Sequence, residues 1–116
     1  MKSVNIGRIG EKKSKEYLKR HNYTVYASSI NSPGVDIIAF KDGVVYLIEV
    51  KTTKQSDIPV KRLINMKQLN YYKSFANEIR EQGFTVEIQL HVWRFINNCS
   101  KSKILSYKLE IINYEL

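Results

Sequence analysis

Two short apolar runs separated by an Asp-Gly turn constrain the fold of this chain more than any other feature. Residues 35–40 and 44–52 are rich in Val, Ile and aromatic side chains, which favour extended backbone. The Lys41-Asp42-Gly43 segment between them contains a dipeptide typical of a tight hairpin turn. Because both runs are nearly all apolar, we expect them to lie in the centre of a sheet that is covered on both faces.

A helix is predicted on each side of this hairpin in the sequence. Residues 7–21 carry apolar or small side chains at helical spacing. A second helix ends near Gln82 and has two possible starts: Pro59 at its first position, or Asn65 as a cap answered by Gln68. Its inner face is expected to consist of Leu63, Met66, Leu69, Tyr72, Ala76 and Ile79.

Three further strands complete the predicted sheet. They are expected over residues 23–29, over 84–96 and around 104–111, each from residues that favour extended backbone. In the second of these, one face is expected to hold Phe84, Val86, Ile88, Leu90 and Val92. The order α-β-β-β-α-β-β predicts an α/β fold, with a central mixed sheet of about five strands flanked by two helices. One domain spanning residues 1–116 is expected.

Composition excludes several classes of protein. The 116 residues carry a net charge of +8, which favours a polyanionic partner such as nucleic acid. No apolar run is long enough to span a bilayer, and no secretory signal precedes the first predicted helix. The single cysteine, Cys99, excludes an internal disulfide framework. The sequence contains no glycine-rich phosphate loop, so we expect no small-molecule cofactor. We expect a cytoplasmic protein, or one of the host cytoplasm if it is virally encoded.

Three charged residues interrupt the apolar strands. Glu49 and Lys51 are two residues apart and therefore share one face of their strand, while Asp36 begins the preceding strand and is returned beside Glu49 by the hairpin. Two carboxylates this close repel unless a cation lies between them, and their hard oxygen atoms suit Mg²⁺ or Mn²⁺. The alternative for Glu-x-Lys alone is a solvated surface ion pair.

The same residues resemble a nuclease signature. Val35-Asp36, twelve residues, and then Glu49-Val50-Lys51 resemble the PD-(D/E)xK motif of restriction-endonuclease-like nucleases. Gly7-x-x-Gly10-Glu11, at the start of the first predicted helix, makes the chain similar to the archaeal Holliday junction resolvases in particular. Val60-Lys61-Arg62 and Trp93-Arg94-Phe95 also fall where that family has similar residues, so the resemblance covers most of the chain.

The resemblance implies a role for each matching position. Asp36, Glu49 and the Val50 carbonyl match the family's metal ligands, Glu11 completes the site, and Lys51 matches the lysine that orients water or steadies the charged phosphorane. It further implies a restriction-endonuclease-like fold, Mg²⁺ with Mn²⁺ as a substitute, and a homodimer that matches the symmetry of a four-way DNA junction. Recombination and repair of DNA would be its setting.

The chain also departs from the family's pattern. Val35 stands in place of the signature proline, and Lys12 and Ala27 or Ser28 stand where relatives carry arginines. Contacts with DNA are therefore expected from residues that flank the site or lie in a serine-bearing loop. They are Lys12, Ser29, Ser32, Lys54, Lys61 and Arg62.

Other residues that could carry chemistry have simpler interpretations. His21 and His91 are isolated and are interpreted as packing or surface residues. Tyr71, Tyr72 and Phe75 on the second predicted helix are interpreted as core or dimer-interface residues.

The sequence thus predicts a homodimeric, Mg²⁺-dependent endonuclease that makes paired nicks in four-way junctions. One alternative is a related nuclease acting on single-stranded, flap or duplex DNA. Another is a DNA-binding protein that uses this scaffold without cutting.

Overall fold

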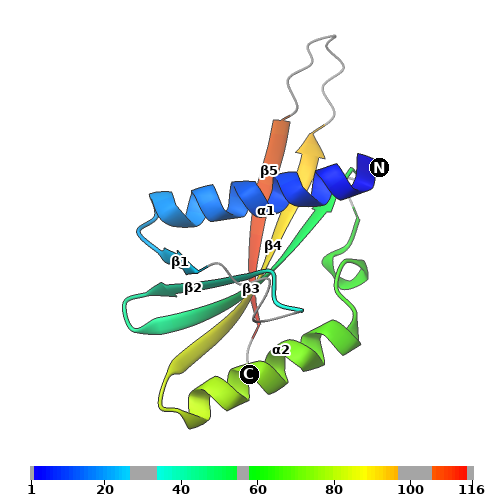
Figure 1. The fold of residues 1–116 in the computed structure, drawn as a ribbon. Coiled ribbons are helices and arrows are strands. Elements are labelled where there is room, and N and C mark those ends of the chain that lie inside the picture. The colour runs from blue at the N-terminus through cyan, green and yellow to red at the C-terminus, as the bar shows by residue number, and fades with distance from the viewer. Residues whose placement is uncertain (1, 27–33, 55–57, 97–105, 115–116) are drawn as a thin grey trace.

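The protein folds as a five-stranded sheet with one helix on each face (Figure 1). This computed structural model describes residues 2–26, 34–54, 58–96 and 106–114. Its elements are α1 (Lys2–Arg20), β1 (Thr24–Tyr26), β2 (Ile37–Lys41), β3 (Val44–Thr53), the 3-10 helix η1 (Val60–Arg62), α2 (Met66–Glu81), β4 (Thr85–Ile96) and β5 (Ser106–Tyr114). The predicted α/β fold with a mixed sheet and two helices is confirmed. Neither helix in these ranges is long and apolar enough to cross a membrane.

The strands lie in the order β1-β2-β3-β4-β5, so β3 is the central strand. β2 and β3 form the predicted hairpin, with Lys41 opposite Val44 and Ile37 opposite Ile48. Asp42 and Gly43 both have positive φ, 52° and 82°, as a tight turn of the type favoured by Asp-Gly requires. The hairpin therefore forms where the sequence predicts it.

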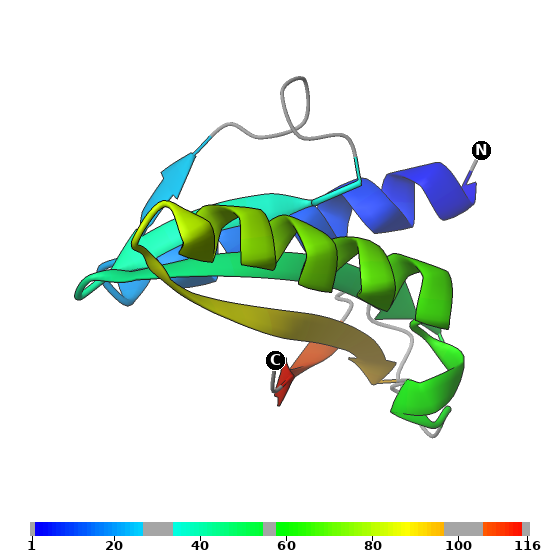
Figure 2. The same cartoon turned by 90° about the horizontal axis from the view of Figure 1, so that it is seen from below.

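β3 and β4 are parallel, unlike the other three neighbouring pairs. A parallel pair needs a long crossover, and here that crossover contains α2. Figure 2 shows α2 lying along one face of the sheet. Its Tyr72 and Ala76 pack against Leu47 of β3 and Val86 and Ile88 of β4. The crossover thus places one face of α2 directly over the central strand.

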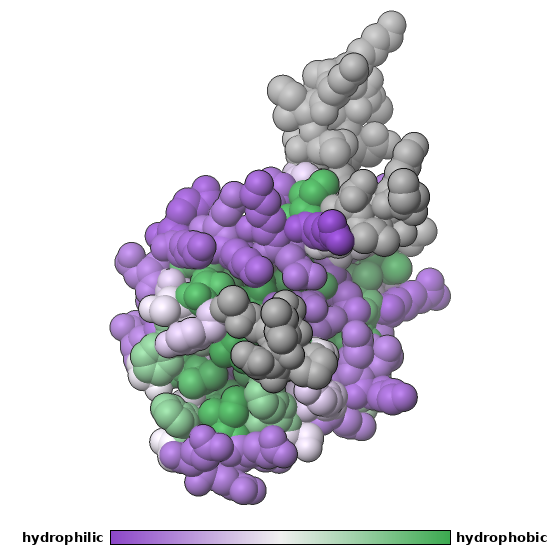
Figure 3. Space-filling view, viewed as in Figure 1, coloured by the Kyte–Doolittle hydropathy of each residue, from purple (hydrophilic) through white to green (hydrophobic). Residues whose placement is uncertain are grey.

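α1 covers the opposite face. Leu18 packs with Ile37 and Ala39 of β2 and with Ile48 of β3. The side chains of β3 alternate, so Ile48 faces α1 while Leu47 and Glu49 face α2. In Figure 3 the outer surfaces of both helices are hydrophilic, and hydrophobic side chains gather between them where the sheet lies.

Some predicted boundaries and burials are wrong. α1 begins at Lys2, so the Gly7–Gly10 pair lies inside the helix and does not open it. Met66 and Phe84, both assigned to core faces, are 66% and 49% exposed, because Met66 is the first residue of α2 and Phe84 precedes β4. β5 extends to Tyr114, three residues beyond its expected end. The expected strand and turn residues 27–33, and residues 104 and 105, lie outside the described ranges.

Both signals for the start of the second helix are used. Pro59 precedes η1, and the Asn65 side chain accepts a hydrogen bond from the Gln68 N–H at 2.8 Å to cap α2. In a full capping box the Gln68 side chain would also bond to the backbone N–H of Asn65. Here the Gln68 side-chain amide donates to Glu49 instead. α2 ends as predicted before Gly83, whose φ is +97°.

Gly10 lets α1 approach the sheet closely. A Cβ atom at this position would lie 2.1 Å from Thr52 Oγ1 and 3.3 Å from a methyl group of Val50. The close approach brings the next residue, Glu11, to the level of the charged end of β3. Glycine is therefore required here by the helix–strand contact, although the position is helical.

A chain of buried hydrogen bonds also fastens α1 to β4. The Trp93 indole N–H donates to Ser14 Oγ at 2.7 Å, and Ser14 Oγ lies 2.9 Å from His91 Nδ1. His91 Nε2 lies 3.3 Å from the side-chain oxygen Oε1 of Gln89, and Gln89 Nε2 donates to Asn113 Oδ1 of β5. These partners fit a neutral His91 that accepts from Ser14 and donates to Gln89. The interpretation of His91 as a packing residue is confirmed.

The two helical glycines form a matched test of the α1–β3 contact. Gly7→Ala should raise the free energy of unfolding by about 0.5–1 kcal/mol, because glycine is a poor helix former and nothing lies within 4 Å of its Cβ position. Gly10→Ala should be less stable than Gly7→Ala by about 1–3 kcal/mol because of overpacking. Adding Thr52→Ala to Gly10→Ala should recover most of the loss. Urea unfolding measures all three, and equal stability of the two alanine variants would contradict the close contact.

His91 predicts an acid-sensitive core. Burial lowers the pKa of His91 from 6.5 to about 4, so the unfolded chain binds this proton more readily than the folded one. Neutral His91 therefore stabilises the folded state fully above pH 6.5. This stabilisation is lost as the pH falls towards 4, and the free energy of unfolding falls by at most about 3 kcal/mol. Stability should therefore fall more steeply over this range in the wild type than in His91→Gln, which keeps an acceptor and a donor but does not titrate. Denaturant titrations at several pH values measure this, and an equal change of the free energy of unfolding with pH in both proteins would contradict the prediction.

Candidate functional site

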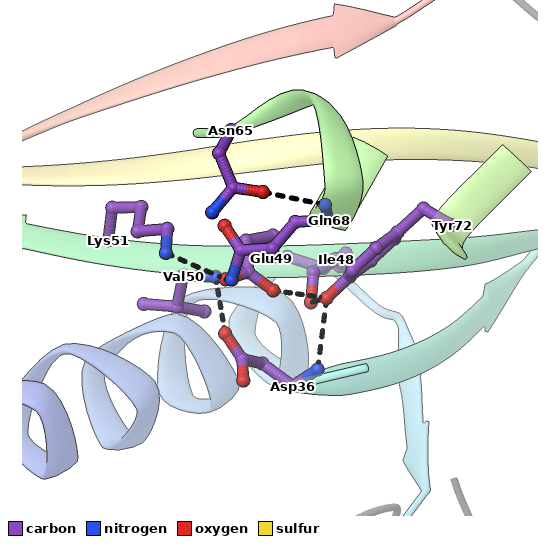
Figure 4. A network of polar contacts seen from close by, with 8 residues as sticks. All are labelled: Asp36, Ile48, Glu49, Val50, Lys51, Asn65, Gln68 and Tyr72. Carbon is purple, nitrogen blue, oxygen red and sulfur yellow. Dashed lines mark hydrogen bonds and ion pairs between the residues drawn. The ribbon is translucent and has the colours of Figure 1, made fainter. Parts of the chain in front are cut away.

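The β2–β3 hairpin brings Asp36 and Glu49 together. Asp36 directly precedes the last pair of the hairpin, Ile37 opposite Ile48, and Glu49 directly follows it. The N–H of Val50, one residue further on, donates to Asp36 Oδ2 at 2.8 Å. Figure 4 shows the Asp36 side chain below β3, between this strand and α1. The predicted meeting of the two acidic residues at one end of the hairpin is confirmed.

Tyr72 of α2 connects the two acidic residues, which the sequence did not predict. Its hydroxyl accepts a hydrogen bond from the Asp36 N–H at 3.1 Å and donates to Glu49 Oε1 at 2.5 Å (Figure 4). The Ile48 carbonyl lies 3.3 Å from the same hydroxyl. Burial and the charge of Glu49 raise the pKa of Tyr72 far above its ordinary value. Tyr72 is therefore a neutral donor fixed between the two strands.

The second carboxylate oxygen of Glu49 has partners of its own. Lys51 Nζ lies 3.1 Å from Oε2, and the Gln68 amide donates to it at 3.3 Å. The Glu49 side chain is only 6% exposed and that of Lys51 is 25% exposed. The alternative of a solvated surface ion pair is thus wrong for this Glu-x-Lys. A buried carboxylate needs such partners, because an uncompensated charge in the interior is costly.

Asp36 has an unusual proton affinity for an aspartate. Burial and the negative charges of Glu49 and Glu11 together raise its pKa from 3.8 to about 7, while the hydrogen bond from the Val50 N–H opposes this increase. Glu11 of α1 acts on Asp36 through its charge, with no direct hydrogen bond between the two side chains in the described ranges. All four predicted residues therefore belong to one neighbourhood, in which Glu11 is half-buried at the margin.

Four of the six residues predicted to contact DNA lie within the described ranges. Lys12, Lys54, Lys61 and Arg62 are all exposed. The start of α1, the end of β3 and η1 lie towards the same end of the molecule, and Lys12 follows from the middle of α1 (Figure 1). Ser29 and Ser32 lie outside the described residues.

The donor atoms fit a hard divalent cation held by few protein ligands. Mg²⁺ in enzymes is usually bound by one or two carboxylates with water completing its shell, and Asp36 and Glu49 supply that number. Within the described ranges, no three His, Cys, Asp or Glu side chains gather closely enough to enclose a metal by themselves. The side-chain oxygen of Gln68 is buried and has no hydrogen-bond partner among the described residues, so a further oxygen is available next to Glu49.

Comparison with known proteins assigns the chain to a family. Residues 10–95 match the model of the uncharacterised protein family UPF0102. The chain belongs to the UPF0102 family. This family is related to the restriction-endonuclease-like nucleases, as the sequence resemblance indicated, but its description assigns it no activity. The matched range contains all four residues of the candidate site.

Two curated UPF0102 relatives support the assignment. A protein of a Nitratiruptor species is 38% identical over 92 residues, which cover 78% of this chain and 81% of the relative. A protein of Koribacter versatilis is 38% identical over 59 residues, covering 47% of this chain and 41% of the relative. Both names state only family membership, so the narrower resemblance to junction resolvases becomes a proposal.

Sequence reasoning missed two residues of this UPF0102 site. Helical periodicity placed Tyr72 correctly on the inner face of α2, but it could not distinguish a core ring from one whose hydroxyl reaches a carboxylate. Gln68 was interpreted only as a capping partner. Both residues follow Asn65 on the same side of α2, at spacings of three and seven, and this polar row at the start of an otherwise apolar face is the signal that could have identified them.

Tyr72→Phe tests this bridge. The change removes the acceptor of the Asp36 N–H and a donor to Glu49 while keeping the ring. It should lower the free energy of unfolding by about 1–3 kcal/mol, the cost of leaving buried polar groups unpaired. Tyr71→Phe is the matched control, since the neighbouring Tyr71 is 42% exposed, and it should change stability by less than about 0.5 kcal/mol. Equal effects of the two changes in urea unfolding would show that the bridge does not stabilise the fold.

Proposed function

We propose that this UPF0102 protein is a metal-dependent DNA endonuclease that acts on branched DNA as a homodimer. One observation supports this most strongly: Asp36, Glu49 and Lys51 converge at the end of a central hairpin, where Glu49 is buried and held by Lys51 at 3.1 Å. Buried carboxylates with a neighbouring ammonium are expensive to maintain for stability alone. They suit hydrolysis of a phosphodiester, in which charge develops on the phosphoryl oxygens.

In this proposal each residue has a distinct task. Asp36, Glu49 and the Val50 carbonyl would hold Mg²⁺, with Mn²⁺ as a substitute because it prefers the same oxygen ligands. Bound there, the ion lowers the pKa of water and neutralises phosphate charge. Lys51 orients the attacking water or donates to a phosphoryl oxygen, and the ion pair with Glu49 keeps its ammonium group at the site.

Glu11 and Tyr72 act around this centre. Glu11 completes the acidic set from α1, on the side of Asp36 away from α2. Tyr72 is a positioning residue, because its hydroxyl contacts both Asp36 and Glu49 without facing an exposed surface. Charge-assisted and buried hydrogen bonds of this kind hold ligands in place before substrate arrives.

The exposed cations provide the surface for DNA. Lys12, Lys54, Lys61 and Arg62 are exposed on or next to α1, β3 and η1, and the chain carries a net charge of +8. Such a surface binds phosphates through release of counterions. The similarity of the Asp36–Lys51 segment and Glu11 to archaeal junction resolvases favours a four-way junction as the substrate.

Cleavage of defined DNA tests the proposal. Labelled four-way junctions, flaps, single strands and linear duplex are incubated with the protein and Mg²⁺ or Mn²⁺, with EDTA as the control. Paired symmetric nicks confined to junctions support a resolvase. Cutting of flaps or single strands instead supports a nuclease with another branched or unpaired substrate. Binding without cutting of any substrate contradicts an endonuclease and favours a DNA-binding protein on this scaffold.

Neutral substitutions of the carboxylates should separate cutting from binding. Asp36→Asn and Glu49→Gln should each lower the cleavage rate by at least about a hundredfold, since they remove a ligand of the catalytic centre. Junction affinity in a gel-shift assay should be unchanged or higher, because no phosphate contact is lost. Glu78→Gln on the exposed surface of α2 is the control and should cleave normally. Wild-type cleavage by either site variant would show that the site is misassigned.

A further inference from the structure

β5 ends the sheet as a long strand with one open edge. It has nine residues, and all of its pairing within the described ranges is with β4, from Ile88 opposite Tyr114 to Ile96 opposite Ser106. The other edge strand, β1, has three residues in the part of the chain that the structure describes. A long edge offers a row of unpaired N–H and C=O groups that can add a strand from another chain. The two edges of this sheet therefore differ sharply in their capacity to pair.

The side chains of β5 do little to prevent such pairing. Leu109 and Ile111 on one face, and Ile112 and Tyr114 on the other, are half-buried apolar residues. Figure 2 shows β5 at the outer margin of the sheet, away from α2. From α1, the Lys13 ammonium group reaches the Tyr107 ring at 4.8 Å. Proteins protect monomeric edges with proline, bulges and several charges, whereas β5 contains no proline and two charged residues of opposite sign, Lys108 and Glu110.

The sequence of β5 complements itself in one antiparallel register. When two copies pair with Leu109 at the centre, Lys108 of each copy lies opposite Glu110 of the other, so two ion pairs form. Leu109 then faces Leu109, and Tyr107 faces Ile111 of the second copy. Centring the pair on Lys108 or on Glu110 would place like charges directly opposite each other, which is unfavourable. Of these three registers, the Leu109 register is the one that pairs opposite charges and places apolar side chains opposite each other.

Glu110 is already oriented for this role. Arg94 of β4 holds Glu110 Oε1 at 3.2 Å, and the Glu110 side chain is 45% exposed. A carboxylate accepts several hydrogen bonds, so the ion pair within the subunit leaves it able to accept Lys108 from a second copy. The intramolecular pair reduces the side-chain entropy that the intermolecular one would cost.

We propose that a second copy of this chain pairs with β5 across its open edge, antiparallel and centred on Leu109, to form a two-fold dimer with one continuous ten-stranded sheet. The two-fold axis of such a pair is perpendicular to the sheet. Both α2 helices therefore lie on the same side of the dimer.

The register relates this axis to the candidate active site. Lys51 on β3 lies opposite Val92 on β4, which lies opposite Glu110 on β5, one residue from Leu109. Five strand spacings separate the two copies of β3, or about 24 Å at about 4.8 Å each. If the proposed function holds, one dimer presents two nuclease sites on one face to a single branched DNA. The pairing itself does not depend on that function.

Charge exchange tests the dimer without DNA or metal. The wild type should be dimeric in sedimentation equilibrium at micromolar concentration. Lys108→Glu and Glu110→Lys should each dissociate at least about tenfold more readily, because each places like charges opposite each other twice. An equimolar mixture of the two variants should recover a dimer as tight as the wild type, since the mixed pair restores both ion pairs. The mixture also controls for the loss of the Arg94 contact in Glu110→Lys.

Three results would overturn the proposal: a monomeric wild type, a dimer that Lys108→Glu leaves unchanged, or a mixture no tighter than its components. Mass is the readout, so a failure of the proposed nuclease activity would leave these outcomes interpretable. If DNA is cleaved, the single-charge variants should retain nicking and lose the pairing of nicks.

A cross-link tests the register separately. In a Cys99→Ser background, Leu109→Cys places two thiols directly opposite each other at the axis, within the Cα separation that a disulfide spans. Mild oxidation should therefore yield a covalent dimer. Thr24→Cys, exposed on β1 at the opposite edge, is the matched control and should remain monomeric on a denaturing gel. Cross-linking of the Thr24→Cys variant alone would show that the interface lies at the β1 edge and would contradict pairing through β5.

Discussion

The hydroxyl of Tyr72 is the contact on which the geometry of this site depends. It accepts from the backbone of Asp36 and donates to the carboxylate of Glu49, so the start of β2 and the middle of β3 are held at one point. A neutral hydroxyl suits this position because a buried carboxylate gains a donor without a second full charge entering the core. Lys51 and Gln68 occupy the other carboxylate oxygen, and Glu49 is thereby oriented before any ligand binds.

The central hairpin and its charges could be predicted from sequence because their signals are local. Asp42-Gly43 specifies a turn, the turn specifies the register, and the register places Asp36 beside Glu49 whatever the rest of the chain does. The face shared by Glu49 and Lys51 follows from the two-residue period of a strand. For the same reason the alternating residues of β4 from Val86 to Val92 are buried as expected. Phe84, beyond the strand end, has no sheet neighbour to define its side.

The contributions of α2 and α1 could not be predicted in this way, because they depend on contacts between distant segments. Periodicity defines the inner face of α2 but not which strand residue lies beneath each turn, so Tyr72 and Gln68 remained core and cap residues. Gly10 is similar: its need for glycine arises from Thr52, far along the chain, and not from its own helical conformation. His91 pairs with Ser14 across a still longer separation.

The parallel pairing of β3 with β4 explains why these distant contacts meet at the charged end of the hairpin. A parallel neighbour requires the chain to return over the sheet, and in the described ranges between β3 and β4 the one α-helix is α2, which must then lie over one face of β3. Since Leu47 and Glu49 share that face, a helix covering Leu47 also covers Glu49 and must offer it polar partners. α1 is already on the opposite face. The buried carboxylate, the tyrosine above it and the glutamate of α1 are therefore consequences of one topology, and the open edge of β5 lies two strands away from the site on the same sheet.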